Sequence, residues 1–109
     1  MAWLVRGERV LASLEVANGF LARNRGLIGR SAIEGAMLLP HTNGVHTVGV
    51  RFPIDVAWLD KNLVVLRTVR LRRFRVAVPR RRAKYMLEAE AGAFERWTLQ
   101  VGDALEIKE

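Results

Sequence analysis

Short apolar segments that alternate with polar residues, and that end at turn-forming residues, dominate this sequence. Residues 10–17 and 85–90 follow a period of two, which is the spacing of a β-strand with one face buried. Residues 63–78 form a longer stretch rich in β-branched side chains. Turn signals recur roughly every 8–12 residues, as in all-β proteins. The pattern predicts a mainly β fold: a small antiparallel β-sandwich or barrel with one or two short helices.

The expected elements can be placed along the chain. A short helix is expected at residues 19–27, after the N-cap residue Asn18, and one more helical turn at residues 92–97. No linker, repeat or low-complexity segment interrupts the pattern, so residues 1–109 form a single predicted β domain. The strands are expected at residues 3–6, 10–17, 36–39, 45–50, 55–60, 63–71, 85–90 and 104–108.

Composition excludes several classes of protein. The chain has no cysteine, which excludes a disulfide framework, thiol catalysis and thiolate metal sites. Half of the residues are apolar, which is too many for a disordered tail. No apolar run approaches the ~20 residues of a membrane-spanning helix. Residues 1–6 lack the basic and then apolar pattern of a secretory signal, so we expect a cytoplasmic protein.

Positive charge is concentrated in one part of the chain. The net charge is +7, yet residues 61–87 hold ten cations and no acid, so the remaining residues sum to −3. Such segregation favours a basic face that attracts phosphates or other anions. The candidate polyanion surface comprises Arg67, Arg70, Arg72, Arg73, Arg75, Arg80, Arg81, Arg82 and Lys84.

The same cations would also be expected without any anionic partner, for two reasons. Charged side chains on an edge strand prevent edge-to-edge aggregation. The excess of 15 arginines over three lysines also fits a GC-rich genome, although that does not account for where the arginines lie. Aromatic residues are sparse in the segment, with only Phe74 and Tyr85, so no stacking platform for single-stranded nucleic acid is recognisable.

A second group of polar residues lies between residues 46 and 55. His46, Thr47, Arg51 and Asp55 fall within ten positions, and Pro53 interrupts the strand between them. The chain therefore turns back there and brings polar groups together as a candidate ligand site. A His–Asp pair can act as a general base and its orienting group. The structural alternative is that Asp55 accepts backbone N–H bonds or pairs with Arg51 to hold a turn.

Arg30 is a further candidate for the ligand site. It follows Gly26 and Gly29, whose backbone amides could approach an anion, but the segment lacks the length and the Lys-Ser/Thr ending of a P-loop. The structural alternative is a helix C-cap at Gly29 and an ion pair between Arg30 and a buried carboxylate such as Glu88. The spacing of His41 and His46 matches no common metal site, so no metal or cofactor is predicted.

Four segments resemble a known family. They are Gly26-Leu27-Ile28-Gly29-Arg30, the stretch from His46 to Asp60 that contains Phe52-Pro53-Ile54-Asp55, Leu87-Glu88-Ala89-Glu90-Ala91-Gly92, and Val101-Gly102-Asp103. In order and spacing they are similar to the bacterial and archaeal domain-of-unknown-function family 192 (DUF192). The resemblance implies a single β domain of jelly-roll-like architecture and no established catalytic residues. Many members carry an aromatic-Met-Lys-Asn-Thr stretch where this chain has residues 46–50, so no ligand contact is carried over from that stretch.

These observations favour a small non-enzymatic binding or accessory domain that recognises an anionic partner or ligand. One alternative is a hydrolase-type enzyme that uses His46 and Asp55 with an activated water. No serine lies in a Gly-x-Ser-x-Gly elbow, so such an enzyme would have no side-chain nucleophile. The second alternative is non-specific nucleic-acid binding through Arg67 to Lys84.

Overall fold

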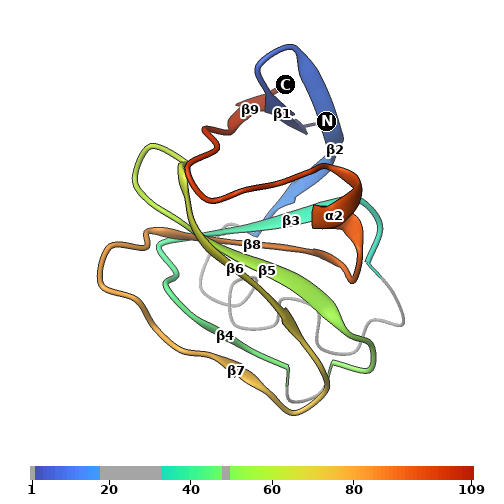
Figure 1. The fold of residues 1–109 in the computed structure, drawn as a ribbon, viewed down its shortest axis with the longest axis vertical. Coiled ribbons are helices and arrows are strands. Elements are labelled where there is room, and N and C mark those ends of the chain that lie inside the picture. Colours follow the sequence, from blue (N-terminus) through green and yellow to red (C-terminus); the bar gives the residue numbers. More distant parts are fainter. Residues whose placement is uncertain (1, 18–32, 48–49) are drawn as a thin grey trace.

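The structure is a computed structural model that describes residues 2–17, 33–47 and 50–109 (Figure 1). It is mainly β, as the sequence predicts. The strands are β1 (Ala2–Arg6), β2 (Arg9–Val16), β3 (Ala36–Pro40), β4 (Val45–His46), β5 (Ile54–Leu59), β6 (Val65–Leu71), β7 (Val76–Ala77), β8 (Tyr85–Glu90) and β9 (Glu106–Lys108), and one short helix, α2, spans Ala93–Arg96.

Seven of the strands form one sheet in the order β6-β5-β8-β3-β2-β1-β9, and β4 pairs with β7 in a second, two-stranded sheet. The large sheet is mixed, because β2 and β3 run parallel while the other pairs are antiparallel. A parallel pair needs a long crossover, and residues 17–35 supply its length. The outermost strands of this sheet are β6 and β9. An isolated bridge pairs Val64, next to β6, with Ala104, shortly before β9, but the sheet does not close into a barrel.

Both faces of the large sheet are buried at its centre. On β5, Ala57 and Leu59 belong to one apolar cluster, which includes Phe94 and Trp97 from α2 and the turn after it. The alternate residues Ile54, Val56 and Trp58 belong to a second cluster on the opposite face. The face towards α2 is called the helix face below. The opposite face, on which Val45, Val50, Phe52, Ala77 and Ala83 pack, is called the loop face.

The observed elements differ from the predicted ones mainly in two segments, residues 45–50 and residues 63–78. Of the strand expected at residues 45–50, the described residues form β4 at Val45–His46, and Thr47 and Val50 lie outside it. The strand predicted at residues 63–71 is β6. The stretch rich in β-branched residues continues to residue 78, but the chain turns at residues 73–74, with Phe74 at a φ of 58°, before the short strand β7. The helix expected at residues 19–27 lies outside the described residues, whereas the helical turn expected at residues 92–97 is α2. Among the described residues no helix is long and apolar enough to cross a membrane.

Candidate functional site

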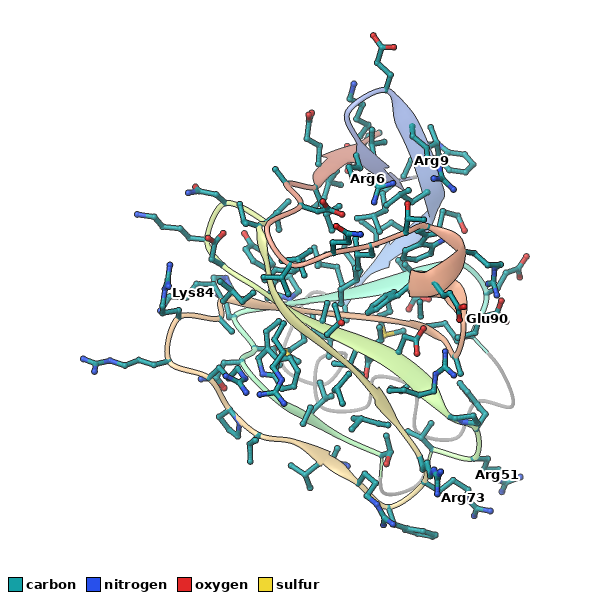
Figure 2. The ribbon with its side chains drawn as sticks, in the orientation of Figure 1. Arg6, Arg9, Arg51, Arg73, Lys84 and Glu90 are labelled. Carbon is teal, nitrogen blue, oxygen red and sulfur yellow. The ribbon has the colours of Figure 1, made fainter. Side chains whose placement is uncertain are left out.

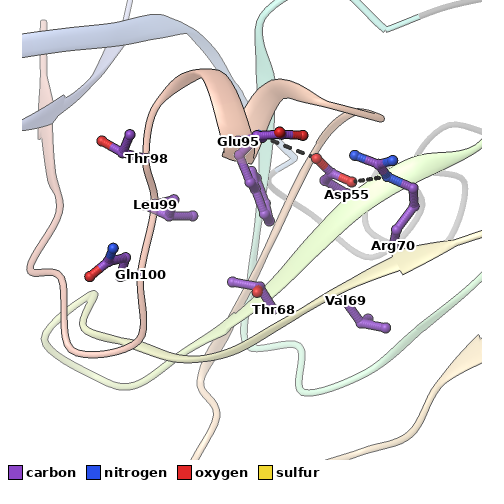
Figure 3. Close-up of a pocket in the computed structure, with 9 residues that line it drawn as sticks. Asp55, Thr68, Val69, Arg70, Glu95, Thr98, Leu99 and Gln100 are labelled. Carbon is purple, nitrogen blue, oxygen red and sulfur yellow. Dashed lines mark hydrogen bonds and ion pairs between the residues drawn. The ribbon is translucent and has the colours of Figure 1, made fainter.

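Asp55 is a buried carboxylate on β5 that points to the helix face (Figure 3). Its Oδ2 accepts hydrogen bonds from the backbone amides of Gly92 and Phe94, at 2.9 and 3.2 Å. Its Oδ1 accepts one from Arg70 Nε on β6, at 2.9 Å. Gly92 is the N-cap residue of α2 and has no side chain to cap the helix. Asp55 therefore caps α2 from a neighbouring strand and satisfies amides that would otherwise lack partners.

Arg70 is the charged partner of this carboxylate. The hydrogen bond to Asp55, followed by the attraction of its charge, raises the pKa of Arg70 above the usual value. Arg70 is therefore a permanent cation beside the cap. The partner expected from the sequence, Arg51, is instead an exposed residue of the loop before β5. Asp55 therefore has the structural role that the sequence offered as an alternative to a ligand site: it accepts backbone N–H bonds, and its arginine partner is Arg70 instead of Arg51.

An open hollow of about 570 Å³ lies beside this pair, between β6 and the segment that follows α2. Thr68 and Arg70 line it from β6, and Glu95, Thr98 and Gln100 line it from the opposite side (Figure 3). Its charged groups are of both signs, and Asp55 at its base already accepts three hydrogen bonds. The hollow therefore offers no concentration of charge for an anionic ligand.

Thr47 is a fully buried polar residue that follows β4. Its hydroxyl accepts a hydrogen bond from the Arg75 amide at 2.7 Å and donates one to the Arg72 carbonyl at 2.6 Å. The Thr47 amide donates to the Arg75 carbonyl at 2.8 Å. Thr47 therefore fastens the turn between β6 and β7 to the end of β4.

The residues of the predicted His46–Asp55 site are separated in the structure. His46 is exposed on β4, opposite Val76, and its neighbour Val45 packs on the loop face. Asp55 points to the helix face, so the large sheet lies between them. A His46–Asp55 general-base pair is therefore not assembled, and the described residues contain no cluster of three metal-ligating side chains. The predicted contact between Arg30 and Glu88 lies outside the described residues.

The basic surface consists of seven cations on the two sides of β7: Arg72, Arg73 and Arg75 before it, and Arg80, Arg81, Arg82 and Lys84 after it. All are exposed except Arg80, which is half-buried. In the part of the chain that the structure describes, none of the seven forms an ion pair with a carboxylate. Figure 2 shows Arg73 at the lower right of the protein and Lys84 at its left edge, with Arg9 near the top.

The basic surface contains a second hollow of about 570 Å³. Leu66 and Val78 line it, together with the three consecutive arginines Arg80, Arg81 and Arg82. This hollow therefore combines apolar side chains with charged side chains that are all positive.

The buried Trp58 holds this hollow in place from the loop face. Its Nε1 donates a hydrogen bond to the Val78 carbonyl at 3.0 Å, and the Arg80 guanidinium lies 5.1 Å from the centre of its ring. Arg80 Nε is buried and has no hydrogen-bond partner among the described residues. Burial of Trp58 fits the core packing typical of a tryptophan in a strand, but its contacts with residues 78–80 are not visible in the sequence.

Exposed apolar residues also lie on this surface, and the sequence analysis did not predict them. Phe74, Val76 and Val78 are 62, 60 and 61 % exposed. These three residues alternate with Arg73, Arg75 and Ala77, and this alternation alone does not show which of the two faces is exposed.

Relatives of the chain come from archaea. A UPF0127 protein of Pyrococcus furiosus is 32 % identical over 108 residues, which cover 94 % of this chain and 93 % of that protein. A UPF0127 protein of Thermococcus gammatolerans is 31 % identical over 98 residues, which cover 84 % of this chain and 64 % of the longer relative.

The fold has also been seen in a solved structure. A crystal structure of a protein of unknown function from Novosphingobium aromaticivorans superposes with a TM-score of 0.79 at 18 % identity, over 96 % of this chain and 82 % of that one. The family model of DUF192, described as an uncharacterized ACR, matches residues 3–107. The resemblance drawn from the sequence is confirmed, and the chain belongs to the DUF192 family.

Proposed function

We propose that this domain is a non-enzymatic binding module for anionic partners, and that the basic surface is its binding site. The observation that carries the proposal is the seven cations around β7, none of which is neutralised by a carboxylate within the described residues. Cations that are solvated and unpaired attract an anionic surface and release its counterions on binding.

The anchoring of the surface supports this proposal. Thr47 fixes the turn that carries Arg72 and Arg75, and Trp58 fixes the loop that carries Arg80. The backbone between these cations is therefore held before a partner arrives, which reduces the entropy lost on binding. Edge protection alone does not need cations on a loop outside the sheet, as Arg81 and Arg82 are.

Retention on a heparin column tests the proposal. The double variant Arg81→Gln/Arg82→Gln removes two unpaired cations from the hollow in the basic surface. The double variant Arg9→Gln/Lys108→Gln removes the same charge from exposed positions on β2 and β9. We expect the first variant to elute at clearly lower salt than the second, with both folded by circular dichroism.

Two results would overturn the proposal. One is elution of the unmodified protein below roughly 0.15 M salt, where the Debye length is about 8 Å and nonspecific surface attraction is already weak. The second is an equal shift for both double variants, since net charge rather than the basic surface would then set the affinity.

A further inference from the structure

Three large apolar side chains are exposed together in the middle of the basic surface. Phe74 lies in the turn before β7, Val76 lies on β7, and Val78 directly follows it. Val76 and Val78 flank the buried Ala77, so they project on the side opposite to the core. Isolated exposed apolar residues are ordinary, but a group of three within five positions marks an interaction surface.

Phe74 is not explained by the requirements of the fold. Its φ of 58° is a left-handed backbone conformation, in which an aromatic residue is strained and glycine is not. Its side chain is 62 % exposed, so it adds little to the core. A strained position that keeps an exposed aromatic residue points to a role outside the fold.

The charges next to Phe74 are arranged around it. The Arg73 guanidinium lies 5.2 Å from the centre of the Phe74 ring, and Arg75 Nη1 donates a hydrogen bond to the Phe74 carbonyl at 3.3 Å. Val78 is shared with the hollow that Arg80, Arg81 and Arg82 line. Phe74 and Val78 are therefore each close to at least one unpaired cation.

We infer that the basic surface docks on an anionic lipid bilayer, with Phe74, Val76 and Val78 entering the headgroup region. Arginines next to exposed apolar side chains match the surface of such a membrane, because lipid phosphates bind the guanidinium groups while the apolar groups reach the boundary between the headgroups and the acyl chains. In Figure 1, β7 forms the outer rim of the protein on the side away from β1 and β9, and a bilayer accommodates a projecting rim without a shaped pocket. The inference rests on the proposed function and specifies the anionic partner as a lipid membrane.

Co-sedimentation with lipid vesicles tests this inference. One set of vesicles is phosphatidylcholine alone, and the second is phosphatidylcholine mixed with phosphatidylglycerol. The variant Phe74→Ser/Val76→Ser removes two of the apolar groups and no charge. The matched control Val10→Ser/Val101→Ser removes two valines that are 57 and 65 % exposed on β2 and in the turn before β9.

We expect the unmodified protein to sediment with the anionic vesicles and not with the neutral ones. Partition of Phe74→Ser/Val76→Ser to anionic vesicles should fall about tenfold, because two apolar groups no longer enter the membrane. Its retention on heparin should not change, since its charge is unaltered. The control variant should match the unmodified protein in both assays.

Several outcomes would overturn the inference. If the protein is retained on heparin but ignores anionic vesicles, the proposed function holds and the lipid partner is wrong. The same applies if Phe74→Ser/Val76→Ser partitions like the control. If the unmodified protein is a dimer by light scattering and this variant is a monomer, the apolar group joins two copies of the chain instead. Failure on both heparin and vesicles removes the proposed function as well.

Discussion

Asp55 and Arg70 face each other on the neighbouring strands β5 and β6, with 2.9 Å between Asp55 Oδ1 and Arg70 Nε. The two side chains differ in environment, since that of Asp55 is 6 % exposed and that of Arg70 is 53 % exposed. Asp55 also accepts hydrogen bonds from the two backbone amides at the start of α2. The contributions of the two residues to stability are therefore expected to be unequal.

Asp55→Asn should lower the free energy of unfolding by about 1–3 kcal/mol, because an amide group cannot accept all three of the hydrogen bonds that the carboxylate accepts. Urea unfolding followed by circular dichroism measures the change. Glu8→Gln, in the exposed turn between β1 and β2, is the control and should leave the midpoint unchanged. Equal midpoints for the two variants would show that Asp55 does not cap α2.

Arg70→Gln should cost less than about 1 kcal/mol, because solvent screens an ion pair whose cation is half-exposed. The backbone amides of Gly92 and Phe94 would still bind Asp55 in this variant. The same unfolding experiment compares it with Asp55→Asn. A loss as large as that of Asp55→Asn would mean that the ion pair, and not the helix cap, is the main contribution of Asp55.

Thr47→Val should lower the free energy of unfolding by about 1–3 kcal/mol, because the variant leaves the Arg75 amide and the Arg72 carbonyl without their buried partner. Thr68→Val is a control of the same shape, at a half-buried position on β6 whose hydroxyl has no hydrogen bond among the described residues. Hydrogen exchange of the Arg75 amide should accelerate in Thr47→Val only. If it accelerates in neither variant, Thr47 does not fasten the turn.

The central strands were predictable from the sequence, whereas the pairing of Asp55 was not. The apolar side chains are numerous enough to predict β3, β5 and β8 from residues 36–39, 55–60 and 85–90, without knowledge of which strands are their neighbours. If β5 and β6 paired without a bulge, the register of the pair Leu59 and Val65 would place Asp55 opposite Val69. The structure shifts the register by one residue between Trp58 and Leu59, and this shift brings Arg70 opposite Asp55.

Contacts between distant segments account for the remaining differences. The cap on α2 comes from Asp55, 37 residues before Gly92, so no local capping pattern reveals it. The parallel pair of β2 and β3 depends on how the intervening chain crosses over, and period-two alternation is the same in parallel and antiparallel strands with one covered face. The exposed apolar residues after β6 were visible in the sequence, but alternation alone does not show which of two faces is buried.

Gly44→Ala should destabilise the two-stranded sheet. A Cβ atom at this position would lie 2.7 Å from the Ala77 carbonyl oxygen and 3.0 Å from the Pro79 nitrogen, both of which are backbone atoms. The β4 and β7 segments would have to separate, which costs about 1–3 kcal/mol, as is usual for overpacked sites. Gly7→Ala is not a suitable control, because Gly7 has a positive φ. Ala104→Gly, at an exposed position, is a better one.

The expected signature of Gly44→Ala is local as well as global. Amides that join the segments next to β4 and β7, such as the Arg80 amide bonded to the Asn43 carbonyl, should exchange faster than those of β5 and β8. Heparin retention should fall with them, because both sides of the basic surface depend on this contact. Unchanged exchange at Arg80 would contradict the close approach of Gly44 to residues 77–79.

Phe74→Gly should separate membrane binding from stability. Glycine relieves a left-handed conformation that costs non-glycine residues about 1–2 kcal/mol. The greater backbone freedom of glycine when unfolded offsets about 0.5–1 kcal/mol of that gain. Loss of the exposed cation–π contact between Arg73 and the Phe74 ring lowers the free energy of unfolding by about 0.5–1 kcal/mol more. The free energy of unfolding should therefore stay within about 1 kcal/mol of the unmodified protein, while partition to anionic vesicles falls.

His41→Gly is the matched control for this prediction, because His41 is also exposed and has a φ of 56°. It relieves the same kind of strain without removing an apolar group from the basic surface. Urea unfolding and vesicle co-sedimentation measured on both variants decide the outcome. His41→Gly should keep the vesicle binding that Phe74→Gly loses. A large loss of stability in Phe74→Gly alone would instead assign Phe74 to the fold, and its strained backbone would then be the cost of a structural contact.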